Sequence, residues 1–364
     1  MRKLLGMTKG ASLVEYGTLI ALIAVFSIGV TLLLGEKVKD IFGGVQTALS
    51  QPAATPPAAT PPAVDECIGP PMAFWDVVST EYNNPIWAVA NNGSQWVALG
   101  GQTSFDILTS FNGSDWSTQT LDGGAGRAVA HDGTQWVAAG EGGTIYTSPD
   151  GIIWTERDSG TDMHIRSIAH DGTQWTGVGF GGSDGNHVVT SLDGVNWTSH
   201  VGLDDTGQGG VLLGIATDGN MWVRVNFFGI ISTSSNGIDW IRQAPRDGDF
   251  FSVAHHGNQW VTVGTNGRIM TSPNGLDWTT QTSVTTNQLE HITHDGTHWV
   301  ATGRRGTILY STDGVNWVMQ EEGSENLFAV YGTGEEQGGS NPAWVAVGDN
   351  GTILTTFNTG CVAL

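Results

Sequence analysis

The chain has 364 residues and a formal net charge of −21, and the negative charge is concentrated in one part of it. After residue 64 there are nine arginines, no lysine and 32 acidic residues, a balance of −23. This surplus argues against nucleic acid and anionic surfaces as partners, because like charges repel. It favours solubility, cationic partners or calcium-dependent contacts.

The chain begins with a basic leader, residues 1–10, followed by a long apolar segment. Residues 16–35 carry no charge and, as a helix, would extend roughly 30 Å, enough to span a bilayer core. Apolar residues then continue at helical spacing, which predicts one hydrophobic helix over residues 11–49. The positive leader is expected to stay cytoplasmic, which places the rest of the chain outside.

A secretory signal also combines a basic start with an apolar core. Two observations argue against that interpretation. No small-x-small cleavage site closely follows the apolar run, and the helical pattern continues beyond it.

The residues around the start of the helix resemble the processing site of a type IV prepilin. Gly10 directly precedes a segment whose fifth residue is Glu15 and whose sixth is Tyr16, and this Glu-Tyr pair is similar to the Flp (type IVb, tight-adherence) pilins. The resemblance implies cleavage by the prepilin peptidase between Gly10 and Ala11. It also implies that Glu15 neutralises the new amino terminus of a neighbouring subunit, since a lone carboxylate at the edge of an apolar helix is costly unless paired.

The pilin resemblance covers residues 1–49 only. It implies a homo-polymer formed through the N-terminal helix, with the prepilin peptidase and the pilus assembly machinery as partners. The expected location is the inner membrane before assembly and an extracellular surface filament afterwards. Flp pilins usually end near residue 49 and this chain does not, which leaves open whether it is a major or a minor subunit. The alternative is a membrane-anchored binding module that does not polymerise.

Residues 50–64 form a linker rich in proline, alanine and threonine. The unit Pro-Ala-Ala-Thr-Pro occurs twice in tandem. This composition prevents helix continuation and favours polyproline II, which gives a semi-rigid spacer of at most about 45 Å. The linker is expected to hold a bulky domain away from a packed helical core.

From residue 74 onward, one pattern recurs with a period near 40 residues. A first tryptophan occurs seven times at intervals of 38 to 47 residues, at Trp96, Trp136, Trp175, Trp222, Trp260, Trp299 and Trp344. Each unit contains several short strand-like runs separated by glycine-containing turns. This combination predicts a mainly β fold, a seven-bladed β-propeller over residues 65–364.

A second motif, Ser-x-Asp/Asn-Gly-x-x-Trp, occurs six times, ending at Trp116, Trp154, Trp197, Trp240, Trp278 and Trp317. It resembles the Asp-box of sialidase-like propellers, with one residue fewer before the tryptophan. Asp or Asn can accept hydrogen bonds from nearby backbone amides, glycine supplies a positive φ, and tryptophan packs over the hairpin. These turns are therefore predicted to be folding elements and not binding residues.

The seventh unit ends before a second tryptophan, and residues 73–79 supply a strand-like run at the other end of the domain. We therefore predict that this first strand closes the last blade. Cys67 and Cys361, the only two cysteines, would then be brought together, and a disulfide between them fits an extracellular compartment. Two distant cysteines make a poor metal site, because zinc takes about four ligands, and no metal is expected.

Departures from the repeat mark where a ligand site could lie, because the fold does not need them. They include Phe227-Phe228, the basic pair Arg304-Arg305, and Asp204-Asp205 in a long loop. We expect them on the face that carries the glycine-rich turns, as a candidate face for an unknown surface or glycan ligand. Drift in surface loops is the alternative. Histidines that precede Asp-Gly turns, such as His131 and His294, are interpreted as turn packing.

A sialidase-like glycosidase would need three clustered arginines and a nucleophilic tyrosine. The arginines are few and carry no recognisable flanking motif. Tyr146 and Tyr310 occupy one position of the repeat, which favours a structural role. The sequence therefore predicts a non-enzyme without a cofactor, with a displayed glycosidase as the weaker alternative.

Overall fold

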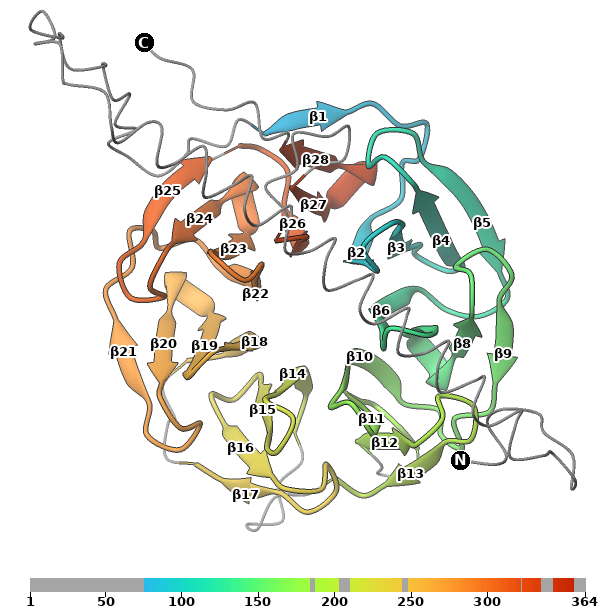
Figure 1. The fold of residues 1–364 in the computed structure, drawn as a ribbon, viewed down its shortest axis with the longest axis horizontal. Helices are drawn as coiled ribbons and strands as arrows, with labels where there is room; N and C mark the ends of the chain where they lie inside the picture. The colour runs from blue at the N-terminus through green and yellow to red at the C-terminus, as the bar shows by residue number, and fades with distance from the viewer. Residues whose placement is uncertain are drawn as a thin grey trace, which may run out of the picture. The chain divides into compact units, whose positions relative to one another are not determined.

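The computed structural model describes residues 75–183, 187–202, 210–243, 248–321, 323–334 and 343–356. Within these ranges the chain forms seven four-stranded antiparallel sheets arranged around a central axis (Figure 1). The predicted mainly β, seven-bladed propeller is therefore confirmed. Outside the described residues lie the leader, the predicted helix 11–49, the linker 50–64, and the residues Cys67, Cys361, Asp204 and Asp205.

Six blades follow one another along the chain, each numbered from its innermost strand outward. Blades 1 and 2 contain β2 (Ile86–Asn91), β3 (Trp96–Gly100), β4 (Phe105–Ser110), β5 (Ser117–Leu121), β6 (Gly126–His131), β7 (Trp136–Gly140), β8 (Ile145–Ser148) and β9 (Thr155–Arg157). Blades 3 and 4 contain β10 (His164–His170), β11 (Trp175–Phe180), β12 (Val188–Ser191), β13 (Thr198–His200), β14 (Leu212–Thr217), β15 (Trp222–Asn226), β16 (Ile231–Ser234) and β17 (Ile241–Arg242). Blades 5 and 6 contain β18 (Phe250–His256), β19 (Gln259–Gly264), β20 (Ile269–Ser272), β21 (Thr279–Gln281), β22 (Leu289–His294), β23 (Trp299–Gly303), β24 (Ile308–Ser311) and β25 (Val318–Glu321).

The seventh blade combines both ends of the described chain. Its inner strands are β26 (Leu327–Gly332), β27 (Trp344–Gly348) and β28 (Ile353–Thr356), and its outer strand is β1 (Asp76–Val78). β1 runs antiparallel to β28, with Asp76 opposite Thr355 and Val78 opposite Ile353. The first described strand thus lies beside the last one and closes the ring (Figure 1).

The hydrophobic core lies between the blades and not inside any one of them. Seven clusters of buried residues occupy the seven interfaces between neighbouring blades. The first tryptophan of each repeat is buried in such an interface: Trp136 of blade 2, for example, packs with Val97 and Leu99 of blade 1. Because a tryptophan buries 150–250 Å², one such residue per repeat accounts for much of the contact between blades.

The turn between the third and fourth strands of blades 1 to 6, here called the box turn, has one geometry in six copies. Its Asp or Asn accepts two backbone N–H hydrogen bonds of 2.7 to 3.0 Å. The next residue is a glycine with φ between 68° and 72° in all six, a conformation that side chains rarely adopt. In five copies the tryptophan indole N–H donates to that glycine's carbonyl. The Asp or Asn and the glycine therefore stabilise the turn in all six copies, and the tryptophan hydrogen bond does so in five.

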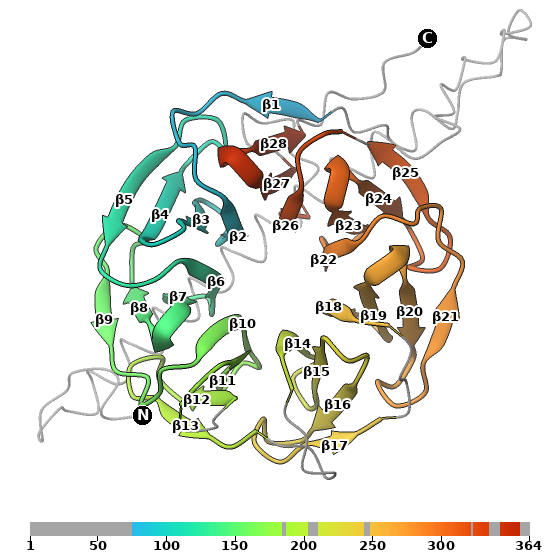
Figure 2. The same cartoon turned by 180° about the vertical axis from the view of Figure 1, so that it is seen from behind.

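Four blades carry a single 3-10 turn between their second and third strands (Figure 2): η1 (Glu141–Gly143), η2 (Thr265–Gly267), η3 (Arg304–Gly306) and η4 (Asp349–Gly351). The middle residue of each turn is left-handed, and in η3 that residue is Arg305, with φ 58°. Since the second strand runs antiparallel to the first, these turns lie at the end of the channel where the inner strands begin. Among the described residues, no helix is long and apolar enough to cross a membrane.

Candidate functional site: the central cavity

All seven inner strands contain a register shift near their start, at the third residue of β10 and at the second residue of the other six, which is a β-bulge. A bulge re-aims the side chain of the extra residue, and such features are common beside functional sites. Here the seven extra residues line one cavity of about 540 Å³ at the centre of the ring. We call them the bulge ring: Trp87, Arg127, Arg166, Leu213, Phe251, Glu290 and Phe328.

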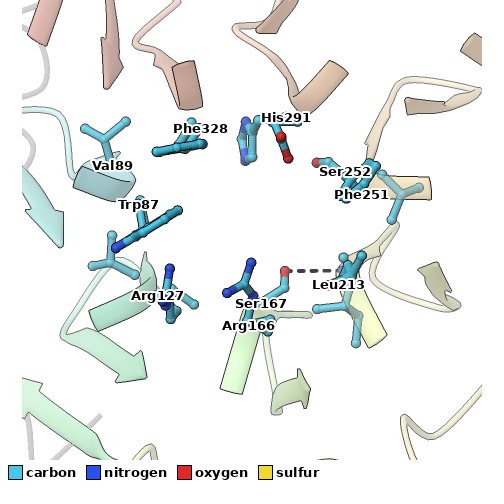
Figure 3. A pocket seen from close by; sticks show the side chains of 18 of the residues that line it. Trp87, Val89, Arg127, Arg166, Ser167, Leu213, Phe251, Ser252, His291 and Phe328 are labelled. Atoms are coloured by element: carbon cyan, nitrogen blue, oxygen red, sulfur yellow. Dashed lines mark hydrogen bonds between the residues drawn. The ribbon is translucent and has the colours of Figure 1, made fainter. Parts of the chain in front are cut away.

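One side of the bulge ring is a stack that crosses three blades. The rings of Phe328 and Trp87 are stacked with centroids 4.4 Å apart, and the guanidinium carbon of Arg127 lies 3.8 Å from the Trp87 centroid (Figure 3). Arg127 also donates from Nε and Nη2 to Oε1 of Glu141, and the Trp87 indole N–H donates to the Gly101 carbonyl at 3.0 Å. Ion pairing and stacking therefore fix Arg127 and neutralise its charge.

Arg166 is the next member of the bulge ring, and it differs from Arg127 in having no ion partner. Among the described residues, no carboxylate lies within ion-pair distance of its guanidinium, and its nearest aromatic ring, Phe180, is 5.9 Å away. Burial, together with repulsion from Arg127, lowers the pKa of Arg166 to about 10. The side chain therefore keeps its charge at neutral pH and faces the cavity beside a second guanidinium (Figure 3).

The opposite side of the bulge ring is apolar, with one neutralised acid. Leu213 and Phe251 project from blades 4 and 5 into the cavity. Glu290 of blade 6 accepts hydrogen bonds from Arg304 Nε at 3.1 Å and from Gln288 Nε2 at 2.6 Å. A second acid, Asp349, also lines the cavity and accepts a hydrogen bond from Asn326 at 2.8 Å. The cavity thus combines apolar and polar side chains with one arginine that has no ion partner in the described ranges.

In three blades, the residue that follows the bulge-ring member on the inner strand is polar and bridges to the neighbouring blade. The Ser167 hydroxyl accepts a hydrogen bond from the Ile215 backbone N–H, and Ser252 accepts one from Ile292, both at 3.3 Å. His291 occupies the same position in blade 6, and its Nδ1 accepts from the Val330 backbone N–H at 3.4 Å. Burial lowers the pKa of His291 to about 4, so the ring is neutral at neutral pH.

The residues singled out from the sequence are only partly brought together. Phe227 and Phe228 are 43% and 60% exposed, and Phe227 meets Phe251 of the bulge ring edge to face, with centroids 6.3 Å apart. Arg304 lines the cavity through its pair with Glu290. Arg305 is exposed, and its backbone N–H donates to Asn326.

The bulge ring itself was not predicted from the sequence. Its members occupy one position of the repeat, the third residue of β10 and the second residue of the other inner strands, and they range from arginine to tryptophan and glutamate. Variable, large side chains at one fixed position, between more uniform neighbours, are the signal that could have marked it.

The histidines next to the Asp-Gly turns, and His255 at the matching place in blade 5, pack onto the first tryptophan, with ring centroids 4.4 to 4.7 Å apart. His131, His170 and His294 also accept a backbone N–H from the glycine two residues later. His256 and His294 of neighbouring blades stack at 3.7 Å, which the repeat pattern did not predict. No group of three or more residues suited to holding a metal occurs in the described ranges.

Comparisons with known proteins support the propeller fold and do not indicate a function. No protein-family model matches the chain, and no curated protein matches it. A solved structure of YCF48 bound to a D1 peptide is similar at TM-score 0.60 and 16% identity, over 79% of this chain and 99% of that chain. YCF48 from Cyanidioschyzon merolae is similar at TM-score 0.60 and 14% identity, over 79% of this chain and all of the other. At such identities the likeness shows the propeller fold alone.

Proposed function

We propose that this chain is a subunit of an Flp/Tad-like type IV pilus that displays its propeller on the cell surface as a binding module. The filament part rests on the sequence around Gly10 and Glu15 and on the uncharged run that follows. Polymerisation would occur through the helix of residues 11–49, after cleavage by the prepilin peptidase, and the linker would hold the propeller outside the filament core.

The observation that carries the binding role is the central cavity. Side chains of several chemical kinds converge there from seven blades at a position that the repeat itself leaves free. Concave sites that bring apolar side chains together with fixed polar groups are the usual form of ligand sites, and this cavity contains both. The structural neighbour solved with a D1 peptide is a propeller that binds a ligand, which supports the same general role for this one. Adhesion without catalysis follows as the expected activity.

Mass spectrometry of the N-terminal peptide in filaments sheared from the cell surface tests the filament part. The expected result is abundant protein that starts at Ala11. Protein absent from that fraction, and starting at Met1 in membranes, would instead identify a membrane-anchored module and overturn the filament proposal.

The role of Glu15 has its own test. Glu15→Ala is expected to be processed normally and to fail in assembly, because an unpaired amino terminus would remain in the apolar core. Normal filaments from this variant would contradict the pairing of Glu15 with the neighbouring subunit.

A further inference from the structure

We propose that the central cavity binds a carboxylate carried next to an apolar side chain, with Arg166 as the group that binds the anion. The inference rests on the proposed binding role of the propeller and is independent of filament assembly.

Among the three arginines that line the cavity, only Arg166 has no ion partner in the described part of the chain, and the one other lining acid, Asp349, is hydrogen-bonded by Asn326. Arg127 is neutralised by Glu141, and Arg304 by Glu290. Arg166 is half-buried, remains charged, and has no carboxylate at ion-pair distance among the described residues. A partly desolvated guanidinium is stabilised by an anion more than an exposed one is, because the local dielectric is low and water competes less. The domain is strongly acidic, so an excess of basic residues does not explain the unpaired cation in its central cavity.

Arg127 also contributes to the proposed site, although Glu141 already neutralises its charge. The stack of Phe328, Trp87 and Arg127 holds the second guanidinium in place beside Arg166. Two neighbouring guanidinium groups, of which one is already oriented, favour the planar and bidentate hydrogen bonding that carboxylates accept. The repulsion between them, which adds to the effect of burial in lowering the pKa of Arg166, is relieved when an anion binds.

The remainder of the cavity wall fits an apolar side chain better than a sugar. Leu213 and Phe251 flank Arg166 on the side away from Arg127. The Ser167 and Ser252 hydroxyls already accept hydrogen bonds from backbone amides, and the faces of Trp87 are covered by Phe328 and Arg127. A glycan needs many free polar partners, whereas the other polar side chains of the wall are already engaged. Gln288 donates to Glu290, and Asn326 donates to Asp349 and accepts from the Arg305 backbone N–H. An amphiphilic carboxylate matches the wall, either as a peptide terminus or as a free acid.

The test uses the full chain in detergent solution and isothermal titration calorimetry with N-acetylphenylalanine, N-acetylphenylalaninamide and glucuronate. The free acid is expected to bind, with the amide at least about 10-fold weaker because it lacks the charge. Glucuronate, a carboxylate without an apolar group, is expected to bind at least about 10-fold weaker as well. Failure of the free acid to bind, or equal binding of either comparison compound, would overturn the proposal.

Variants assign the binding to Arg166. Arg166→Gln is expected to weaken binding of N-acetylphenylalanine at least about 10-fold, and Arg166→Lys less, since it keeps the charge without the planar fork. The matched control is Arg157→Gln, which removes the same charge from the outer strand β9, where Arg157 bonds Thr147. Unchanged affinity in both Arg166 variants would refute the assignment, and a thermal melt of each variant checks that it is folded.

Two further comparisons separate the remaining alternatives. Acetyl-Ala-Ala-Ala-Phe with a free terminus should bind more tightly than N-acetylphenylalanine if the source is a chain terminus, and equally if it is a small acid. Both results support a carboxylate site. A processed N-terminus at Ala11 combined with no binding would refute this inference alone, whereas binding without filaments would refute the filament part alone.

Discussion

The side-chain Nε2 of Gln135 donates a hydrogen bond of 2.7 Å to the carbonyl oxygen of Asp193, and so joins blade 2 to the box turn of blade 3. The equivalent Gln174 bonds the carbonyl of Asn236 at 3.0 Å, across blades 3 and 4. Glutamine directly precedes the first tryptophan in four of the seven repeats. The Gln-Trp pair therefore has two roles: the indole fills the interface between blades, and the amide attaches to the neighbouring turn.

Replacing Gln135 with alanine is expected to lower the free energy of unfolding by about 1 kcal/mol, since one hydrogen bond between blades is lost. Blade 4 supplies the matched control, because Met221 holds the same position there and reaches Gly275 of the next box turn. Gln135→Met should cost less than Gln135→Ala, since it keeps the packing. Equal losses in chemical denaturation would show that the hydrogen bond matters and the packing does not, and no loss in either variant would contradict the role of this contact.

The aspartates of the box turns are expected to make the fold less stable in acid, and a substitution can remove this effect. Hydrogen bonds from the backbone and side chain of Asn196 hold the pKa of Asp193 below its ordinary value. Burial would raise the pKa of Asp313, but hydrogen bonds from Asn316 and Val315 outweigh it and the value is about 2. A carboxyl whose pKa is depressed in the folded state stabilises the fold above pH 4, and this contribution is lost as the pH falls towards the folded pKa.

Blades 1, 4 and 5 use asparagine at this position, as in Asn112, with aspartate three residues later. Asp193→Asn is therefore expected to leave stability at pH 7 within roughly 0.5 kcal/mol and to flatten the loss of stability between pH 4 and 2. Urea unfolding at several pH values measures both. The double variant Asp193→Asn with Asn196→Asp copies the other blades and should match the original chain at pH 7. A single variant that stays as acid-sensitive as the original chain would contradict the assignment.

The fold could be predicted from the sequence because its main contacts repeat. Trp136 and its equivalents mark the interfaces, and the box turns mark the hairpins, so their period gives the number of blades without any long-range information. The closing strand was predictable for a similar reason, because the seventh repeat ends without its outer strand and residues 73–79 supply one. Each of these features lies in a short segment with a recognisable pattern.

The cavity could not be predicted in the same way, because it depends on which of two adjacent residues the bulge turns inward. In β2, the side chains of Trp87 and Ala88 exchange faces if the register moves by one residue. Arg166 lies between Ile165 and Ser167 in an ordinary strand pattern, and nothing local indicates that ring closure brings it beside Arg127. Arg304 was singled out only because it forms, with Arg305, a basic pair in an acidic domain.

His291 is expected to give the stability of the fold a second pH dependence, at higher pH than that of the box turns. Its folded pKa of about 4 lies below the ordinary value of 6.5, so the neutral ring stabilises the fold above pH 6.5, and this stability is lost as the pH falls to 4. The change is about 3 kcal/mol at most. Blade 5 has Ser252 at this position, accepting the same kind of hydrogen bond. His291→Ser should therefore keep the contact between blades and reduce the slope of stability against pH between 6.5 and 4. An unchanged slope would exclude His291 as its source.

The closing strand allows a comparison between two adjacent valines. Val78 packs against the buried cluster between blades 7 and 1, whereas Val77 is 76% exposed on the same strand. Val78→Ala is expected to lower the free energy of unfolding by about 1 kcal/mol through lost burial, and Val77→Ala by a few tenths at most. Both changes remove the same two methyl groups and lower the strand propensity equally. The difference between the two variants in differential scanning calorimetry therefore reports the packing of Val78 alone. Equal effects would indicate that β1 contributes through its backbone alone.

The register of that strand also bears on the predicted disulfide between Cys67 and Cys361. Because β1 and β28 are antiparallel with Asp76 opposite Thr355, the chain enters β1 and leaves β28 at the same end of the sheet. A disulfide joining the segments beyond those strands would close a loop of almost the whole propeller, for which the chain-entropy model gives about 6 kcal/mol. Peptide mapping without reductant is expected to yield one peptide pair containing both cysteines. The double variant Cys67→Ser with Cys361→Ser should melt at a lower temperature than the oxidised chain and at the same temperature as the reduced one. Two free thiols in protein taken from the cell surface would contradict the pairing, and blade 7 would then be closed by the β1–β28 ladder without a covalent link.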